Sequence, residues 1–246
     1  MRTPHLPLSM FLSLVACAGS EQEPASMKHH DHHDPGKHGH HHPGGHDHAH
    51  HGGVHHDFSD AAEWSKRFDD PARDAWQKPD EIVKLLAIEP GMTVVDLGAG
   101  TGYFESRLAT AVGPTGKVVA LDPEANMVAF MRDRFEKAGV KNVEPRTCPL
   151  DSTGLPAASA DRVLIVDTWH HIEKREVYAK HLANVLKSGG SVMIVDFTME
   201  TEKGPPKELR VPPEKLVAEL RAGGLEARVV DESLPDQLVV VGKKAL

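Results

Sequence analysis

The chain has 246 residues, of which 36 are acidic and 28 are basic, so its formal net charge is −8. We expect no nucleic-acid partner, because the chain is acidic and has no stripe of lysine and arginine with interleaved aromatic residues. Its two cysteines, Cys17 and Cys148, exclude a framework of disulfide bonds.

Residues 1–17 have the pattern of a bacterial export signal. Arg2 precedes an apolar stretch at residues 6–16, which is too short to span a bilayer as a helix. The segment Leu14-Val15-Ala16-Cys17 resembles a lipobox, in which the cysteine is lipidated after cleavage. We therefore expect an exported protein, anchored by lipid on Cys17 and facing the periplasm or the outside. The alternatives are an accidental apolar N-terminus and a cytoplasmic protein.

Residues 18–57 form a histidine-rich segment of low complexity, which we expect to be disordered. Fourteen of the 18 histidines lie within residues 29–56, mixed with glycine, aspartate and proline. Without apolar periodicity the segment cannot offset the entropy cost of folding. Neutral imidazole binds Zn, Cu and Ni, so loose metal binding is one interpretation; a spacer and an accidental expansion are the others. The candidate ligands are His29, His30, His32, His33, His40, His41 and His42.

Residues 58–246 are enough for one domain, in which strand and helix patterns alternate. Residues 61–78 predict short helices that lie over the domain. We expect longer helices at 79–88, 102–112, 124–138, 173–186 and 212–222, and strands at 92–97, 117–121, 142–148, 161–166, 191–197, 225–230 and 238–241. This alternation predicts a doubly wound α/β fold with a parallel sheet. The last two strands have no helix between them, so we expect an antiparallel hairpin.

Residues 93–103 are the most informative segment of the chain. A short apolar run ends in Asp96, a turn with glycine at every second position follows, and a helical pattern begins at once. Glycine tolerates positive φ and lets the backbone approach a ligand closely. A dinucleotide fingerprint would read G-x-G-x-x-G, but Tyr103 occupies the place of its third glycine. The three glycines are Gly98, Gly100 and Gly102.

The D-x-G-x-G-x-G spacing resembles motif I of the class I S-adenosylmethionine-dependent methyltransferases. The resemblance covers residues 64–243 and implies a Rossmann-like sheet of seven strands, mostly parallel, with a C-terminal antiparallel hairpin. It also implies S-adenosyl-L-methionine as cofactor and a small-molecule methyl acceptor, in a monomer or a dimer. The rival interpretations are a metal-binding lipoprotein on a non-catalytic scaffold of this kind and a nicotinamide oxidoreductase.

The resemblance implies a cofactor site along the ends of the strands. Asp122 falls where the family keeps an acid for the ribose hydroxyls, and it also suits a helix N-cap. Asp151 stands four residues before Leu155-Pro156, where the family has an aspartate for the adenine amino group; the alternative is a loop aspartate. The implied cofactor-binding residues are Asp96, Gly98, Ala99, Gly100, Gly102, Tyr103, Asp122, Pro123, Asp151 and Asp167.

Two histidines are candidate catalytic bases. In the family, the loop after the fourth strand, here residues 167–172, faces the sulfur and the acceptor. His171 falls where many small-molecule methyltransferases have a histidine, and His170 is the second candidate. An imidazole, with a pKa of about 6.5, can take a proton from an acceptor hydroxyl, thiol or amine. The alternative is a wall histidine that bonds the backbone.

Overall fold

The computed structural model describes residues 60–246. The predicted export signal, the lipobox cysteine, the histidine-rich segment and its candidate metal ligands lie outside these residues and stay predictions. Within residues 60–246 no helix has the length and apolar character that crossing a membrane requires. In the same range no group of three or more histidine, cysteine or acidic side chains is arranged to hold a metal ion.

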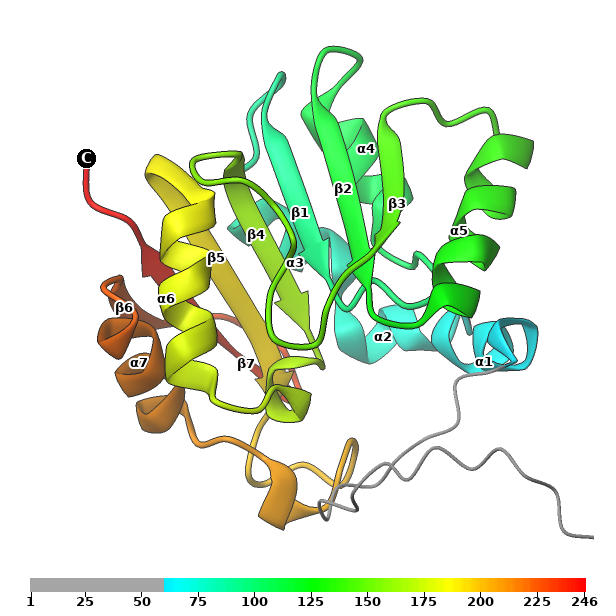
Figure 1. The fold of residues 1–246 in the computed structure, drawn as a ribbon. Helices are drawn as coiled ribbons and strands as arrows, with labels where there is room; N and C mark the ends of the chain where they lie inside the picture. The colour runs from blue at the N-terminus through cyan, green and yellow to red at the C-terminus, as the bar shows by residue number, and fades with distance from the viewer. Residues whose placement is uncertain (1–59) are drawn as a thin grey trace, which may run out of the picture. The chain divides into compact units, whose positions relative to one another are not determined.

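A seven-stranded sheet forms the centre of the domain, in the order β3-β2-β1-β4-β5-β7-β6 (Figure 1). Strands β1 to β5 are parallel, and β7 is antiparallel to both of its neighbours. This confirms the predicted doubly wound α/β fold, in which the final hairpin inserts one antiparallel strand. The strands are β1 (Thr93–Leu97), β2 (Lys117–Asp122), β3 (Val143–Thr147), β4 (Ala160–Val166), β5 (Leu186–Phe197), β6 (Glu226–Val230) and β7 (Gln237–Lys243).

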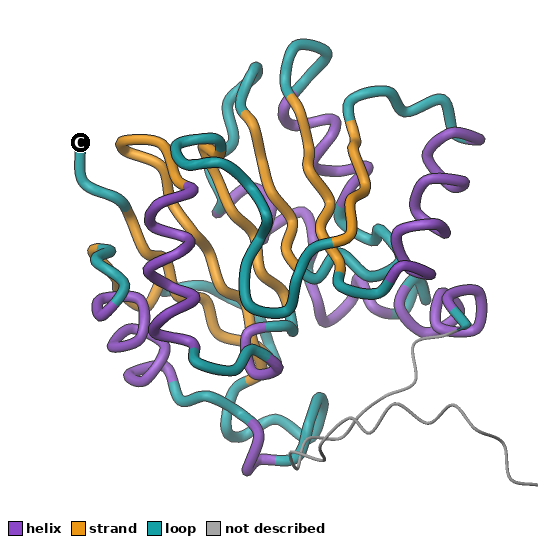
Figure 2. Tube along the Cα trace, in the orientation of Figure 1, coloured by secondary structure: helices purple, strands orange, loops and turns teal. Residues whose placement is uncertain are grey.

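Helices surround the sheet, as the purple segments of Figure 2 show. They are α1 (Ala61–Phe68), α2 (Arg73–Gln77), α3 (Pro79–Leu85), α4 (Glu105–Val112), α5 (Ala125–Lys137), α6 (Arg175–Val185) and α7 (Pro213–Ala222). Two short 3-10 helices, η1 (Trp169–His171) and η2 (Lys207–Leu209), lie in the loops after β4 and β5.

Both faces of the sheet are buried, which explains why its central strands are continuous apolar runs. Neighbouring residues of a strand point to opposite faces. Val94 packs in the cluster that holds Ile82 of α3 and Leu108 of α4. Val95 packs in the cluster that holds side chains of α6 and α7. Helices α3 and α4 therefore cover one face of β1, and α6 and α7 cover the other.

Two predicted helix boundaries were wrong. The helix expected at 102–112 begins at Glu105, because Gly102 has a φ of +89° and cannot lie in a right-handed helix. The helix expected at 173–186 ends at Val185, and the strand expected from residue 191 begins at Leu186 as β5. Leu186 pairs with Ala160 of β4. The register of the β4–β5 pair then shifts, so that Arg162 pairs with Ser191, which follows Gly189 and Gly190. Strand β3 contains Pro145 and lies at the edge of the sheet, where a proline in a strand is tolerated.

Candidate active site

Four aspartates mark the carboxyl ends of the parallel strands β1, β2, β4 and β5. Figure 1 shows these arrowheads pointing to one edge, where α1 and α2 (cyan) and the loop after β5 (orange) lie. The order of the sheet reverses between β1 and β4, and ligands of such sheets bind at this switch point, beyond the carboxyl ends. The aspartates are Asp96, Asp122, Asp167 and Asp196.

Residues 98–102, here called the glycine loop, turn sharply at the end of β1. The backbone N–H groups of Gly98 and Ala99 donate to the carbonyl oxygen of Leu121 at 2.8 and 3.0 Å. Gly98 has a φ of +80°, and a Cβ there would collide with the Thr168 side chain. A Cβ on Gly102, at φ +89°, would lie 2.8 Å from the Phe135 ring. Glycine is required at both positions by conformation and by space.

Asp122 ties the glycine loop to the end of β2. One of its carboxylate oxygens accepts from the Gly100 N–H at 2.8 Å. The other accepts from the Glu124 N–H at 2.9 Å, across Pro123. The expectation that Asp122 is the helix N-cap was wrong, because the N-cap of α5 is Glu124 and no side chain caps it. A carboxylate oxygen can accept more than one hydrogen bond, so Asp122 keeps capacity for the hydroxyl groups of a ligand. Burial raises the pKa of Asp122.

Arg73 of α2 lies over the glycine loop. Its guanidinium carbon is 4.1 Å from the centroid of the Tyr103 ring, a cation–π contact. Its Nη2 is 3.8 Å from Oδ2 of Asp167. Tyr103 in turn donates its hydroxyl proton to Asp74, so α2 is held on the loop from both sides. Arg73 therefore places a positive charge near the carboxyl ends of the strands, where the four aspartates lie.

Asp167 joins the end of β4 to α2 and β7. It adopts a φ of +51°, which is unusual for a residue with a side chain. Its Oδ1 accepts a hydrogen bond from Nε2 of Gln237, whose Oε1 accepts from Nε2 of Gln77. Burial, with the nearby charge of Asp196 adding to it, raises the pKa of Asp167 to about 7.

The two candidate bases are in different environments. His170 Nδ1 lies 2.9 Å from Oδ1 of Asp196, and their side chains are 4% and 2% exposed. A carboxylate at Nδ1 assigns the ring proton to that nitrogen and leaves Nε2 as a proton acceptor. The ring of His171 packs 4.2 Å from that of His170, and its residue is exposed. The structure thus pairs His170 with a buried carboxylate.

The loop at residues 198–211, between β5 and α7, is built around one buried arginine. The guanidinium of Arg210 donates to four backbone carbonyl oxygens, of Thr198, Thr201, Lys203 and Pro205, at 2.7 to 2.9 Å. Beneath this loop the rings of Trp76 and Phe197 stack with centroids 6.0 Å apart. Phe197 follows Asp196 in β5, so its side chain points to the opposite face of the sheet, where it packs on Trp76 of α2.

Asp151 is exposed in the loop between β3 and β4. The same loop is attached to α6, because the Thr153 N–H donates to Nε2 of His181 at 3.0 Å. The negative charge of Asp151 acts on His181, whose pKa is lowered by burial and raised by that charge, with burial the larger effect. The adenine role of Asp151 stays a prediction.

Three residues near the carboxyl ends of the strands were not among the site residues predicted from the sequence. Arg73 and Asp196 are described above, and Glu105 is a fully buried acid in the first turn of α4, next to Asp96. Asp196 carried a signal, because it ends a buried strand with the same apolar-then-aspartate pattern as Asp96 and Asp122. Glu105 and Arg73 carried none, since only tertiary structure brings them here.

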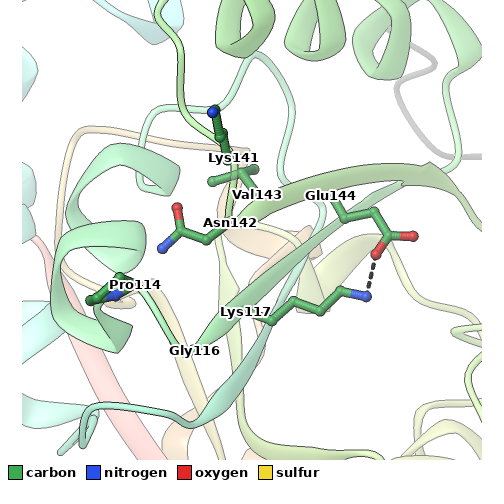
Figure 3. A pocket seen from close by; sticks show the side chains of 7 residues that line it. All are labelled: Pro114, Gly116, Lys117, Lys141, Asn142, Val143 and Glu144. Atoms are coloured by element: carbon green, nitrogen blue, oxygen red, sulfur yellow. Dashed lines mark ion pairs between the residues drawn. The ribbon is translucent and has the colours of Figure 1, made fainter. Parts of the chain in front are cut away.

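An open hollow of about 400 Å³ lies elsewhere, between the amino ends of β2 and β3 (Figure 3). Lys117, the first residue of β2, forms an ion pair there with Glu144. The hollow opens at the sheet edge opposite the four aspartates, so it is separate from the candidate active site. It is lined by Pro114, Gly116, Lys117, Lys141, Asn142, Val143 and Glu144.

Comparisons with known proteins agree with this geometry. A family model described as a methyltransferase domain matches residues 88–227. The ubiquinone/menaquinone biosynthesis C-methyltransferase UbiE of Hydrogenovibrio crunogenus is 31% identical over 128 residues, which is 52% of this chain and 50% of that protein. The chain spans about half the length of the curated relatives it matches.

Solved structures give the same result. The crystal structure of a SAM dependent methyltransferase from Aquifex aeolicus has a TM-score of 0.69 at 30% identity and covers 75% of this chain and 98% of that one. Haemonchus contortus phosphoethanolamine N-methyltransferase 2, in complex with S-adenosyl-L-methionine, has a TM-score of 0.60 at 14% identity. It covers 78% of this chain and 61% of that one, and at this identity it shows a likeness of fold alone.

Proposed function

Since the chain belongs to the family of S-adenosylmethionine-dependent methyltransferases, we propose that it transfers the methyl group of this cofactor to a small-molecule acceptor. The observation that carries the proposal is the convergence of Asp96, Asp122 and Asp167 around the glycine loop. An edge rich in carboxyl groups favours a cationic ligand. When bound, S-adenosylmethionine supplies an electrophilic methyl group on a positively charged sulfur.

The residues present fit this cofactor. Asp122 keeps acceptor capacity for two ribose hydroxyls after it has received its backbone N–H groups. Both carboxylate oxygens of Glu105 are buried and accept no hydrogen bond from an N–H or O–H donor among residues 60–246. Unsatisfied buried acceptors of this kind are costly unless a ligand or a proton serves them. We propose that Asp96, the glycine loop and Asp122 hold the cofactor, with Asp151 toward its base.

We propose His170 as the group that takes the acceptor proton, and Asp196 as the residue that positions it. The Asp196 carboxylate holds the Nδ1 proton, so Nε2 of His170 has a free electron pair. Nε2 of His170 would take the hydroxyl proton of the acceptor, and the electron pair left on the acceptor would make it a better nucleophile toward the methyl group that the bound cofactor supplies. The proton then leaves to solvent from Nε2. Correct placement of the two reactants supplies much of the remaining rate.

The ring of Trp76 favours a flat acceptor. Trp76 is half-buried, so part of its surface stays open, and exposed aromatic surface of this kind binds aromatic ligands well. The relatives are named as C-methyltransferases of ubiquinone and menaquinone biosynthesis, and a hydroxylated ring fits both that name and the His170 base. We therefore propose a hydroxylated aromatic compound as acceptor, which loses its hydroxyl proton as it is methylated.

A transfer assay tests this function. The full chain is incubated with S-adenosylmethionine that carries a labelled methyl group and with a panel of phenols and quinols, alongside thiols and amines as controls. Labelled product from hydroxylated rings, lost in His170→Ala, supports the proposal. Transfer that is confined to thiols or amines, or a His170→Ala variant with the wild-type rate, contradicts it.

We also keep export and lipid anchoring on Cys17 as a proposal from the sequence of residues 1–17. Growth of a producing bacterium with a labelled fatty acid tests it. Label in the wild-type chain that disappears in Cys17→Ala is the expected result. An unlabelled wild-type chain in the cytosolic fraction contradicts it.

A further inference from the structure

Two acidic side chains meet behind the glycine loop, away from solvent. Asp96 is 3% exposed and Glu105 is fully buried. Asp96 follows Val94 by two positions in β1, so it points to the face on which α4 packs. Glu105 is the first residue of α4 and its carboxyl group faces that of Asp96. Residues 97–104, which include the glycine loop, connect the two residues along the chain.

The cations around this pair are already engaged. Arg134 of α5 faces Glu105, but its Nη1 donates to Asp69 at 2.8 Å and to the Thr101 carbonyl oxygen at 3.0 Å. Arg73 of α2 faces Asp96, but it donates to the Gln77 side chain and to the Phe68 carbonyl oxygen. The remaining charged group near Asp96 is Asp122 of β2, which is also acidic. Neither cation forms an ion pair with Asp96 or Glu105.

Two buried carboxyl groups that face each other without a cation cannot both be ionised. Burial, strengthened by the charge of Asp96, raises the pKa of Glu105 well above its ordinary value. Burial also raises the pKa of Asp96, to about 7, although the hydrogen bond from Glu105 and the charge of Arg73 oppose this rise. Once Asp96 has lost its proton, at about pH 7, the pair therefore keeps one proton, on Glu105 and donated to Asp96.

We propose that Glu105 is a positioning residue, which keeps its proton, donates it to Asp96, and so maintains Asp96 as the ionised acceptor for the α-ammonium group of S-adenosylmethionine. This inference rests on the proposed function, because it concerns the same cofactor. It explains why an acid with no N–H or O–H partner is buried in the first turn of α4. In this role Glu105 acts as a hydrogen-bond donor and not as a second negative charge.

The charge state has a consequence for cofactor affinity. Below the pKa of Asp96, binding of the ammonium group must first expel the Asp96 proton, so affinity falls about tenfold per pH unit. Above pH 7 this loss ends, and the α-amino group of the ligand itself loses its proton at a pKa of about 8. Affinity therefore peaks between these two values. A ligand that lacks the amino group, such as methylthioadenosine, should bind without this peak.

Calorimetry on the full chain between pH 5.5 and 9 tests the inference, with S-adenosylmethionine and methylthioadenosine as the two ligands. Glu105→Gln keeps the shape and the donor, so we expect wild-type affinity and the same pH profile. Glu105→Leu removes the donor, which lets the Asp96 pKa rise. We expect about tenfold weaker binding of S-adenosylmethionine at pH 7 and a profile displaced to higher pH, with methylthioadenosine unaffected.

The possible outcomes distinguish failure of this inference from failure of the proposed function. If Glu105→Gln weakens binding tenfold or more while its melting temperature is unchanged, Glu105 binds as a carboxylate and the inference is wrong. If Glu105→Leu folds and binds as the wild type does, or if methylthioadenosine shows the same peak, the inference is also wrong. If Glu105→Leu does not fold, the Glu105→Gln result and the two-ligand comparison still decide. If the wild-type chain binds neither ligand at any pH, the proposed function itself fails.

Discussion

Asp196 holds the Nδ1 nitrogen of His170 at 2.9 and 3.1 Å, one contact from each carboxylate oxygen. Oδ1 of Asp196 also accepts the backbone N–H of Phe197 at 2.9 Å, which fixes the carboxylate at the end of β5. The imidazole is therefore oriented by a rigid strand end, although it lies on a short 3-10 helix in a loop. An orientation of this kind suits a base that must meet its substrate in one geometry.

The neighbouring histidines should respond differently to substitution. Removal of a general base lowers rates by about 10² to 10⁴-fold, so we expect His170→Ala to lower kcat/KM by about 10²-fold or more. His171→Ala is the control at the neighbouring, exposed position, and we expect a loss of less than about threefold there. Steady-state kinetics on the acceptor found in the transfer assay measure both. Equal losses of kcat/KM in the two variants would contradict the assignment of His170 as the general base.

Asp196→Asn tests the positioning role of that carboxylate. The amide cannot hold the Nδ1 proton as a carboxylate does, so the ring loses its fixed tautomer. We expect kcat to fall by about tenfold or more while KM for S-adenosylmethionine stays within about twofold. Kinetics under saturating acceptor separate the two parameters. A selective rise in the cofactor KM would instead place Asp196 in the cofactor site.

Gly98→Ala should damage the fold as well as the site. Its Cβ would collide with the side chain of Thr168, at a φ of +80° that an L-residue rarely adopts. We expect a loss of about 1–3 kcal/mol in the free energy of unfolding, measured by urea titration. Gly139→Ala is the control, since Gly139 also has a positive φ but a Cβ there has no atom within 4 Å. A smaller loss at Gly98 than at Gly139 would contradict the close packing of the loop.

Arg73→Gln should change how cofactor affinity depends on pH. The charge of Arg73 lowers the pKa of Asp96 and of Asp167, and both values are about 7 in its presence. Without it both rise, so a smaller fraction of Asp96 is ionised at pH 7. We expect the loss of affinity for S-adenosylmethionine to be larger at pH 6.5 to 7 than at pH 8.

Arg107→Gln is the matched control for Arg73→Gln. Its guanidinium also lies over the Tyr103 ring, at 5.3 Å, but it pairs with Asp74 and Asp80. It should leave the pH profile unchanged. Parallel profiles in the two variants would show that the effect comes from the ring contact and not from charge at Asp96.

The part of the candidate site at the ends of β1 and β2 was predictable because neighbouring residues in the sequence encode it. Asp96, the glycine loop and Asp122 lie in one strand–turn–helix–strand segment whose spacing and apolar runs are visible in the sequence. Asp196 has the same apolar-then-aspartate signal near the end of β5, but it was not among the predicted site residues.

Other parts of the site depend on contacts that no local pattern encodes. Glu105 resembles an ordinary acid in the first turn of a helix, and only the packing of α4 on β1 turns it toward Asp96. The choice between His170 and His171 depends on the turn of η1, which directs one ring to Asp196. The order of the loop after β5 depends on Arg210, whose four carbonyl partners are spread over eight residues.

The most direct test of the whole assignment is a calorimetric titration of the full chain with S-adenosylmethionine and, separately, with NAD. We predict binding of S-adenosylmethionine and none of NAD. We also predict a loss of about 1–3 kcal/mol in the binding free energy for S-adenosylmethionine in Asp122→Ala, because two ligand hydroxyls lose their acceptor. Heat from NAD with none from S-adenosylmethionine, or an Asp122→Ala variant with wild-type affinity, would contradict the assignment.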